Sequence, residues 1–201
     1  MYYISGKEAC QPLGVSTEVC YTFTKEQLAK EADGLLIYNQ RTDPRGRLRY
    51  GLCSSAVTGC GWIATYNVLR LLGIPAEPAE LIRCYRRKLP LLNGALGTFL
   101  PHVAGYFRRR GFAVRVVRRS GFDEALDCGD VGVLYFWWRD GLRLGTHFAA
   151  VERRQDGFVG YNTYRNSVGP DRLGVSLETF LEERRYFWPV LIAVRKTEAG
   201  H

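Results

Sequence analysis

The chain has 201 residues, of which 46% are hydrophobic and 24% charged, and its formal net charge is +8. This suits one domain with a sizeable core and room for a terminal extension. No apolar stretch reaches the roughly 18 residues that a membrane-spanning helix needs, and no basic segment with a following apolar run opens the chain. We therefore expect a soluble, cytoplasmic protein without a membrane partner.

The positive charge comes largely from arginine, with runs at 108–110, 118–119 and 153–154. A cationic surface attracts acidic substrates, nucleic acid or anionic lipid. Because these arginines flank apolar segments and do not alternate with aromatic residues, we do not expect a nucleic-acid partner. The oligomeric state stays open.

The cysteines contain no Cys-x-x-Cys pair, which argues against a zinc ribbon. In a cytoplasmic protein we expect mostly free thiols, and a disulfide between Cys10 and Cys20 is disfavoured. The chain also lacks a phosphate-binding glycine loop and a His-x-x-x-His motif. No cofactor and no metal site are therefore expected.

Residues 1–50 are predicted to be an extension packed on a domain of residues 51–201. Within the extension, residues 24–32 have a short helical pattern capped by Thr24, and residues 42–46 are rich in turn formers.

A buried helix is predicted over residues 61–72, because only three of these positions are polar and because Gly73 and Pro75 follow. Cys60 stands directly before it, between two glycines. The positive end of the helix dipole stabilises a thiolate there, and the glycines allow a substrate to approach closely. Cys60 is therefore a candidate nucleophile.

Further helices are predicted over residues 78–88, 98–110 and 176–184, the last two capped by Thr98 and Ser176. Short β-rich runs, separated by Gly and Asp turns, occupy residues 112–117, 131–138, 146–153, 158–163 and 189–194. Helices followed by antiparallel strands indicate an α+β fold.

The predicted strands at 146–153 and 158–163 should form a hairpin. If Arg154 pairs with Gly157, His147 lies opposite Tyr164, two positions from Asn162 on the same face of the sheet. The side-chain amide of Asn162 is then placed to orient the imidazole, whose other nitrogen takes the thiol proton.

Each of these residues alone is more often structural than catalytic, since a lone cysteine usually behaves as a small buried hydrophobe. The order Cys60, His147, Asn162 is nevertheless the order of a cysteine-peptidase triad. Gly61, Trp62 and Thr146 are candidates for the substrate cleft. The aromatic run at 135–138 is mainly core strand, although Trp137 or Trp138 is a further possible cleft residue.

Three collinear motifs carry a family resemblance: Cys60-Gly-Trp-Ile-Ala-Thr-Tyr-Asn with the rest of its helix, residues 97–100 with 110–115, and Gly145-Thr-His147-Phe with Tyr161-Asn162. Over residues 51–194 the chain resembles papain-like cysteine peptidases, most closely the bacteriocin-processing (double-glycine) peptidases. The resemblance implies a papain-like fold and a peptide or protein substrate. It also implies Cys60 as nucleophile, His147 as general base and acid, and Asn162 as the residue that orients His147.

This chain departs from the family pattern before the cysteine. The family commonly has a glutamine there whose amide binds the oxyanion, but position 54 is serine. Ser54, Ser55 and Gln40 are the candidate donors, beside the backbone N–H of Cys60. The family also often has proline at the position of Trp62.

These features predict a cysteine-dependent hydrolase, in the first place a peptidase. Two alternatives stay open. An acyltransferase or transglutaminase-like enzyme would use the same triad with an amine in place of water, and a catalytically impaired module would only bind peptides.

Overall fold

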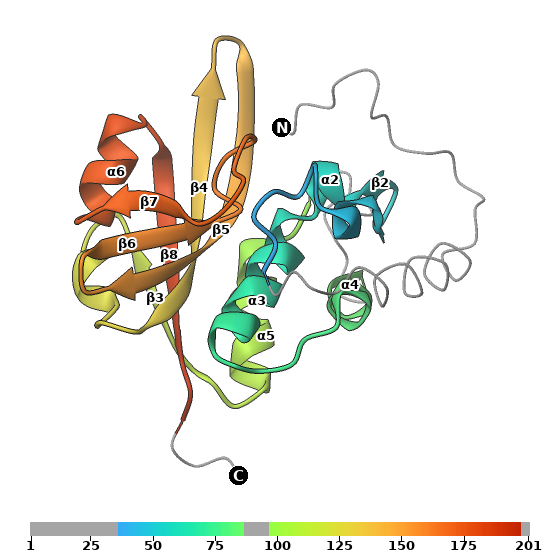
Figure 1. The fold of residues 1–201 in the computed structure, drawn as a ribbon, viewed down its shortest axis with the longest axis horizontal. Helices are drawn as coiled ribbons and strands as arrows, with labels where there is room; N and C mark the ends of the chain where they lie inside the picture. Colours follow the sequence, from blue (N-terminus) through green and yellow to red (C-terminus); the bar gives the residue numbers. More distant parts are fainter. Residues whose placement is uncertain (1–35, 87–96, 198–201) are drawn as a thin grey trace.

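The computed structural model describes residues 36–86 and 97–197. Its main feature is a six-stranded antiparallel sheet of strand order β3-β8-β4-β5-β6-β7, with helices on both faces (Figure 1). Helices thus precede most of the strands along the chain, as the sequence predicted. The predicted helix at 24–32 lies outside the described residues.

The sheet follows the expected strand runs closely, with one addition. The strands are β3 (Ala113–Arg118), β4 (Val131–Asp140), β5 (Arg143–Arg154), β6 (Gly157–Tyr161), β7 (Asp171–Gly174) and β8 (Phe187–Arg195). The sequence did not predict β7, a four-residue edge strand with a single buried side chain, Leu173. The predicted register of the β5–β6 hairpin is confirmed, because Arg154 pairs with Gly157.

The main helices are α3 (Cys60–Leu71), α4 (Pro78–Arg86), α5 (Leu100–Arg109) and α6 (Leu177–Glu183). Each lies within a predicted range or within one residue of it. The α6 cap is also confirmed, since the Ser176 hydroxyl accepts from the backbone N–H of Thr179. The α5 cap is wrong: Phe99 occupies the capping position, while the hydroxyl of Thr98 bonds with that of Tyr50 at 2.9 Å.

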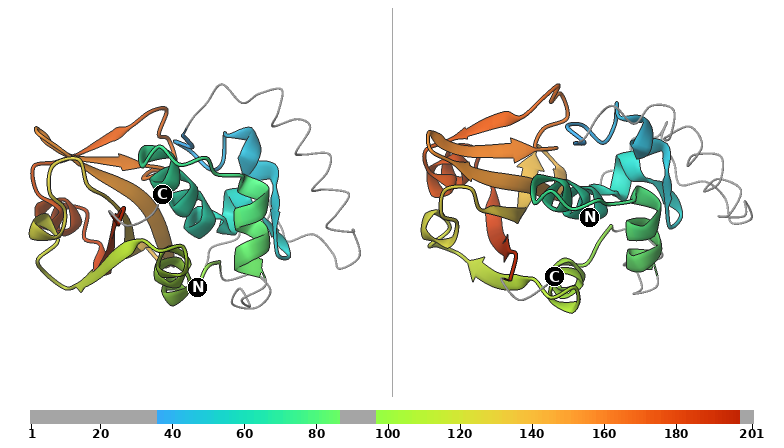
Figure 2. Two further views of the ribbon diagram at one scale, coloured as in Figure 1. Left: turned by 90° about the horizontal axis from the view of Figure 1, so that it is seen from below. Right: turned by 60° about the horizontal axis from the view of Figure 1, so that its bottom comes forward.

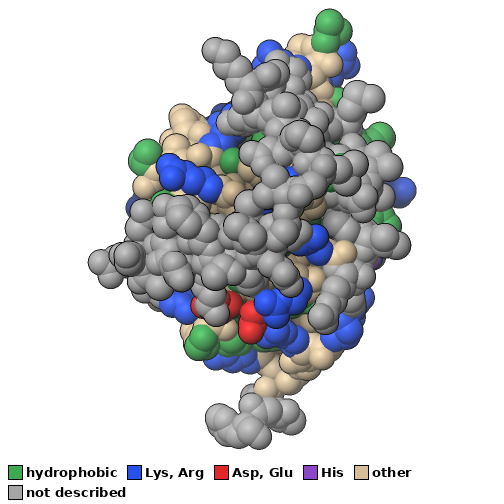
Figure 3. Space-filling model, turned by 90° about the vertical axis from the view of Figure 1, so that its right-hand side faces the viewer, with side chains coloured by type: hydrophobic (Ala, Val, Ile, Leu, Met, Phe, Trp, Pro, Cys, Tyr) green, Lys and Arg blue, Asp and Glu red, His purple; other side chains and the backbone are tan. Residues whose placement is uncertain are grey.

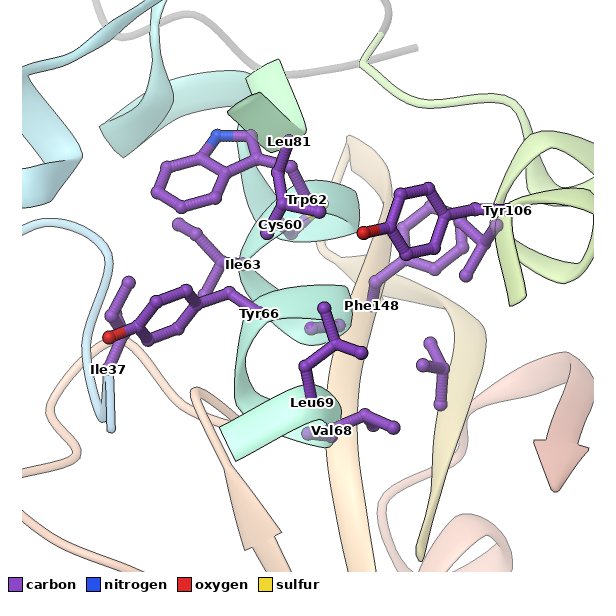
Figure 4. Close-up of a cluster of buried hydrophobic side chains, with 14 of the residues drawn as sticks. Ile37, Cys60, Trp62, Ile63, Tyr66, Val68, Leu69, Leu81, Tyr106 and Phe148 are labelled. Carbon is purple, nitrogen blue, oxygen red and sulfur yellow. The ribbon is translucent and has the colours of Figure 1, made fainter. Parts of the chain in front are cut away.

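Helix α3 is the centre of the molecule. It lies between the sheet and α4 in every view (Figures 1 and 2), and its first ten residues are all buried. Figure 4 shows its side chains, among them Trp62, Ile63, Tyr66 and Leu69, packed against residues of other elements such as Phe148 of β5. A second core cluster fills the opposite face of the sheet beneath α6.

Residues 36–50 contribute three buried side chains to the first core cluster. The assignment of residues 1–50 to an extension packed on the domain stays a prediction. Ile37, Leu48 and Tyr50 are buried there. The backbone N–H and carbonyl of Ile37 both bond with the side-chain amide of Asn67 in α3, at 2.9 and 2.8 Å. This pairing satisfies a buried amide and fixes the chain beside the helix. The segment continues through η1 (Pro44–Arg47), β1 (Arg49–Tyr50), β2 (Cys53–Ser54) and α2 (Ser55–Thr58).

The cysteines follow the prediction only in part. Cys60, Cys84 and Cys128 are free thiols. Cys53 is disulfide-bonded, which the expectation of mostly free thiols did not include.

Arginine dominates the charged surface. On the face that Figure 3 shows, basic side chains appear at many places among the described residues, and acidic ones gather in one small area. The basic side chains visible on this face are therefore not confined to one patch.

Gly61 sets how closely α3 approaches the segment before α5. A Cβ atom at this position would lie 2.3 Å from the Thr98 hydroxyl and 2.4 Å from its Cβ. We expect Gly61→Ala to lower the free energy of unfolding by about 1–3 kcal/mol, the usual cost of overpacking a core.

Urea denaturation measures this loss. Gly169→Ala is the matched control, because a Cβ there meets no atom within 4 Å, and it should change stability by less than about 1 kcal/mol. Equal transition midpoints for the two variants would contradict the close contact between α3 and Thr98.

Candidate active site

Cys60 is placed by a break between two helices. Helix α2 ends at Thr58, Gly59 follows, and the helical hydrogen bonds begin again when Ile63 donates to the Gly59 carbonyl at 3.1 Å. A Cβ at Gly59 would lie 2.6 Å from the Ser55 carbonyl oxygen, so glycine lets the chain turn tightly here. Cys60 is therefore the first residue of α3, where the helix dipole favours a thiolate.

His147 comes from β5, where it pairs with Phe136 of β4. Its Nε2 lies 2.5 Å from the backbone carbonyl oxygen of Asn162. A carbonyl oxygen only accepts, so Nε2 must carry the proton. In the neutral ring Nδ1 is then the acceptor, which is the tautomer that a general base for a thiol requires.

Burial is the main cause that lowers the pKa of His147 below its usual 6.5, and the positive charge of Arg165 adds to it. The hydrogen bond to the Asn162 carbonyl acts in the opposite direction. The imidazole therefore stays neutral to lower pH than an exposed histidine and remains able to accept a proton.

Asn162 holds the site differently from the sequence prediction. Strand β6 ends at Tyr161, and Asn162 adopts a φ of 59° in the left-handed region that asparagine tolerates. The ladder therefore stops before reaching the position opposite His147. The backbone carbonyl contacts the imidazole, and the expected side-chain contact is wrong. The side-chain amide bonds with Gln40 instead.

Two hydrogen bonds join Asn162 to Gln40. The backbone N–H of Gln40 donates to Asn162 Oδ1 at 2.8 Å, and Asn162 Nδ2 donates to Gln40 Oε1 at 3.0 Å. At the far end, Gln40 Nε2 donates to the Ala56 carbonyl at 2.9 Å. The first partner only donates and the last only accepts, so the orientations of both amides are fixed.

Residues 43–46 stabilise the loop that carries Gln40. A Cβ at Gly46 would lie 1.8 Å from the Gln40 carbonyl oxygen, so the two backbone stretches touch. Arg45 pairs with Asp43 at 2.7 Å and donates to the Tyr66 hydroxyl of α3 at 3.0 Å. These contacts fix the position of the Gln40 loop relative to α3.

One pocket of about 400 Å³ joins these groups. Of the predicted residues, Cys60, His147, Asn162, Gln40 and Thr146 line it. So does Trp138, which the sequence had offered as a possible cleft residue. The wall between them is mostly aromatic and arginine side chains, among them Phe136, Arg139, Tyr164, Arg165 and Tyr186.

Four predicted site residues lie away from the pocket. Trp62 is fully buried and its indole N–H donates to the Ser55 hydroxyl at 2.9 Å, so both residues serve the core. Gly61 faces Thr98. Ser54 pairs with Arg49 in the small β1–β2 sheet. The cleft assignments of Gly61 and Trp62 and the oxyanion assignments of Ser54 and Ser55 are therefore corrected.

Sequence reasoning missed the arginine side of the pocket. Arg139 and Arg165 line it with Trp138, yet neither belongs to one of the arginine runs. The available signal was position: both follow closely on strand segments that carry predicted site residues.

Other kinds of site are not evident in residues 36–86 and 97–197. No group of three or more His, Cys, Asp or Glu side chains there could hold a metal ion. Among the helices that the structure describes, none has the length and apolar character to cross a bilayer.

No protein-family model and no curated protein matches the chain. Among solved structures, the fold is similar to the peptidase domain of Streptococcus ComA, a bi-functional ABC transporter involved in a quorum sensing pathway. The TM-score is 0.45 and the identity 14%, and the alignment covers 69% of this chain and 91% of that one. This distant similarity carries no conclusion about the activity of the present chain.

The environment of His147 predicts its titration. Cys60→Ser removes any thiolate from the pocket, and in this background NMR of the ring protons should give a pKa below 6.5 for His147. Arg165→Gln in the same background should raise that pKa, because a nearby cation disfavours the imidazolium.

Arg172→Gln is the control. Arg172 lies on β7, with its side chain exposed and 3.7 Å from Asp156, so it should leave the titration unchanged. A His147 pKa above 6.5, or equal shifts in the two arginine variants, would contradict the electrostatic description of the site.

Proposed function

We propose that this chain is a cysteine-dependent hydrolase of papain-like fold, acting on peptide bonds or related acyl bonds. The observation that carries the proposal is the pocket that Cys60, His147, Asn162 and Gln40 line together, although they come from four separate segments. The tautomer that the Asn162 carbonyl imposes on His147 supports the same assignment.

In the first step, Nδ1 of His147 accepts the proton of the Cys60 thiol, and the thiolate attacks the substrate carbonyl carbon. The tetrahedral intermediate collapses when the C–N bond breaks and the imidazolium gives its proton to the leaving amine. Water then attacks the thioester with His147 as base, which releases the acid and restores the thiol. Cys60 and His147 are thus the catalytic residues.

Gln40 is the proposed oxyanion donor. One hydrogen of its Nε2 is used by the Ala56 carbonyl, and the second remains for a substrate oxygen in the pocket that Gln40 lines. The backbone N–H of Cys60 would be the other donor. Gln40 therefore takes the role that seemed vacant at position 54.

Asn162 is a positioning residue in this proposal. Its carbonyl orients the base and its side chain orients the oxyanion donor. Since one residue holds both groups, their relative placement depends on a single left-handed turn.

Acyl transfer to an amine would pass through the same thioester, and no contact in the pocket favours it over hydrolysis. The impaired peptide-binding alternative rested on a missing oxyanion donor, and Gln40 weakens that reason.

Cys60 should react faster than the other free thiols. At pH 6.5 a thiol of pKa about 8.5 is only about 1% ionised, whereas an activated cysteine is largely thiolate. We expect iodoacetamide to label Cys60 about tenfold faster or more than Cys84 and Cys128, as measured by peptide mass spectrometry.

His147→Gln should abolish this advantage without changing the labelling of Cys128, which is exposed. If Cys60 in the unaltered protein reacts no faster than Cys128, the hydrolase proposal fails and a binding role is favoured.

The Gln40→Ala variant distinguishes oxyanion binding from the reactivity of the Cys60 thiol. Thioester formation from p-nitrophenyl acetate develops an oxyanion, so its rate should fall by about 10²- to 10³-fold. Alkylation by iodoacetamide develops none and should keep its rate. Asn162→Gly, which retains the backbone carbonyl and tolerates a positive φ, should resemble Gln40→Ala.

The double variant tests whether the two amides act as one unit. If Asn162 acts through Gln40, the double variant should lose no more ester turnover than Gln40→Ala alone. Additive losses would show that Asn162 does not act through Gln40, and an equal loss in alkylation would show that Gln40 does not act on the oxyanion.

A further inference from the structure

The pocket has a second wall, formed by Trp138 and Arg139 at the end of β4 and by Arg165 in the loop after β6. The guanidinium carbon of Arg165 lies 5.6 Å from the centre of the Trp138 ring. Here this wall is named the Trp138–Arg165 wall. It borders the same space as Cys60 and His147.

The indole of Trp138 packs against a glycine of the neighbouring strand. Trp138 pairs with Gly145 on β5, and a Cβ at Gly145 would lie 2.4 Å from the indole ring. The indole thus lies directly over the glycine, and any side chain there would displace it. Arg165 is fixed from the other side, because its backbone carbonyl accepts from Asn39 Nδ2 at 2.7 Å.

The charge of this wall is not neutralised. Among the described residues Arg165 forms no ion pair, and the side chain of Arg139 donates to the Gly141 carbonyl at 3.0 Å. The charged residues that line the pocket are Arg41, Arg139, Arg165 and Asp140. Arg139 and Arg165 thus add positive charge to the pocket lining, in which Asp140 is the acidic residue.

The chemistry of such a wall selects its ligand. A guanidinium stacked on an aromatic face keeps its in-plane N–H groups, which match the two oxygens of a carboxylate. Arg165 is exposed, so the neighbouring indole shields these hydrogen bonds from water on one side only.

We propose that the Trp138–Arg165 wall is a subsite for a carboxylate of the substrate, so that the enzyme prefers peptides with an acidic group beside the bond that Cys60 attacks. The inference rests on the proposed function, since it takes the pocket as the place of reaction. A bound carboxylate would also offset the influence of Arg165 on His147.

Iodoacetate and iodoacetamide test this subsite directly, because they differ only by a carboxylate in place of a carboxamide. The measured quantity is the ratio of their alkylation rates at Cys60. Both reagents need the same thiolate, so the ratio cancels any change in the reactivity of the thiol.

The ratio at Cys60 should exceed the ratio at exposed Cys128 in the same protein on the order of fivefold. This is the effect of about 1 kcal/mol from one partly shielded charge pair. Arg165→Gln should remove most of this excess, whereas Arg172→Gln should retain it. Raising the salt to about 1 M should reduce it in the unaltered protein.

Equal ratios at Cys60 and Cys128, or an excess that survives Arg165→Gln, would overturn the subsite while leaving the hydrolase proposal intact. Failure of both reagents to prefer Cys60 over Cys128 in absolute rate would instead defeat the proposed function. The two failures are therefore distinguishable in one experiment.

Discussion

The pair of hydrogen bonds between Asn162 and Gln40 is the constraint on which the candidate site depends. The two residues are far apart in sequence, and each bond uses an atom whose orientation the next bond requires. The chain of contacts ends at the Ala56 carbonyl, one helical turn before Cys60. It therefore links the loop before α3 to the end of the β5–β6 hairpin, whose first strand carries His147.

The sequence predicted the register of the β5–β6 hairpin, but it did not predict where β6 ends. Alternation and the turn at 154–157 predict the hairpin register, which the structure has. Parity then places His147 and Asn162 near each other. Parity applies only while the chain stays extended, and the positive φ at Asn162 ends the strand there. The backbone carbonyl consequently faces the imidazole in place of the amide.

The helix part shows a different limit. Sequence identifies Cys60 because glycines and an apolar helix surround it, but it does not show which neighbours share its face. Successive helical residues are about 100° apart, so Gly61 and Trp62 turn towards Thr98 and Ser55 in the core. Thr146 lies on a strand that borders the pocket, and it does line it.

Gln40 shows why distance along the chain is a poor guide to which residues line a pocket together. The segment between Gln40 and Cys60 contains a 3₁₀ turn, a two-stranded hairpin and a short helix. It folds back so that Ala56 contacts the Gln40 side chain. Such a loop can be lengthened at small entropic cost, so a pocket residue such as Gln40 can stand at a different distance from Cys60 in sequence and still keep its place in space. The position of Gln40 depends on the contacts that support its backbone, which Gly46 and the Arg45–Asp43 pair provide. Residues 36–50 thus contribute to the pocket as well as to the core.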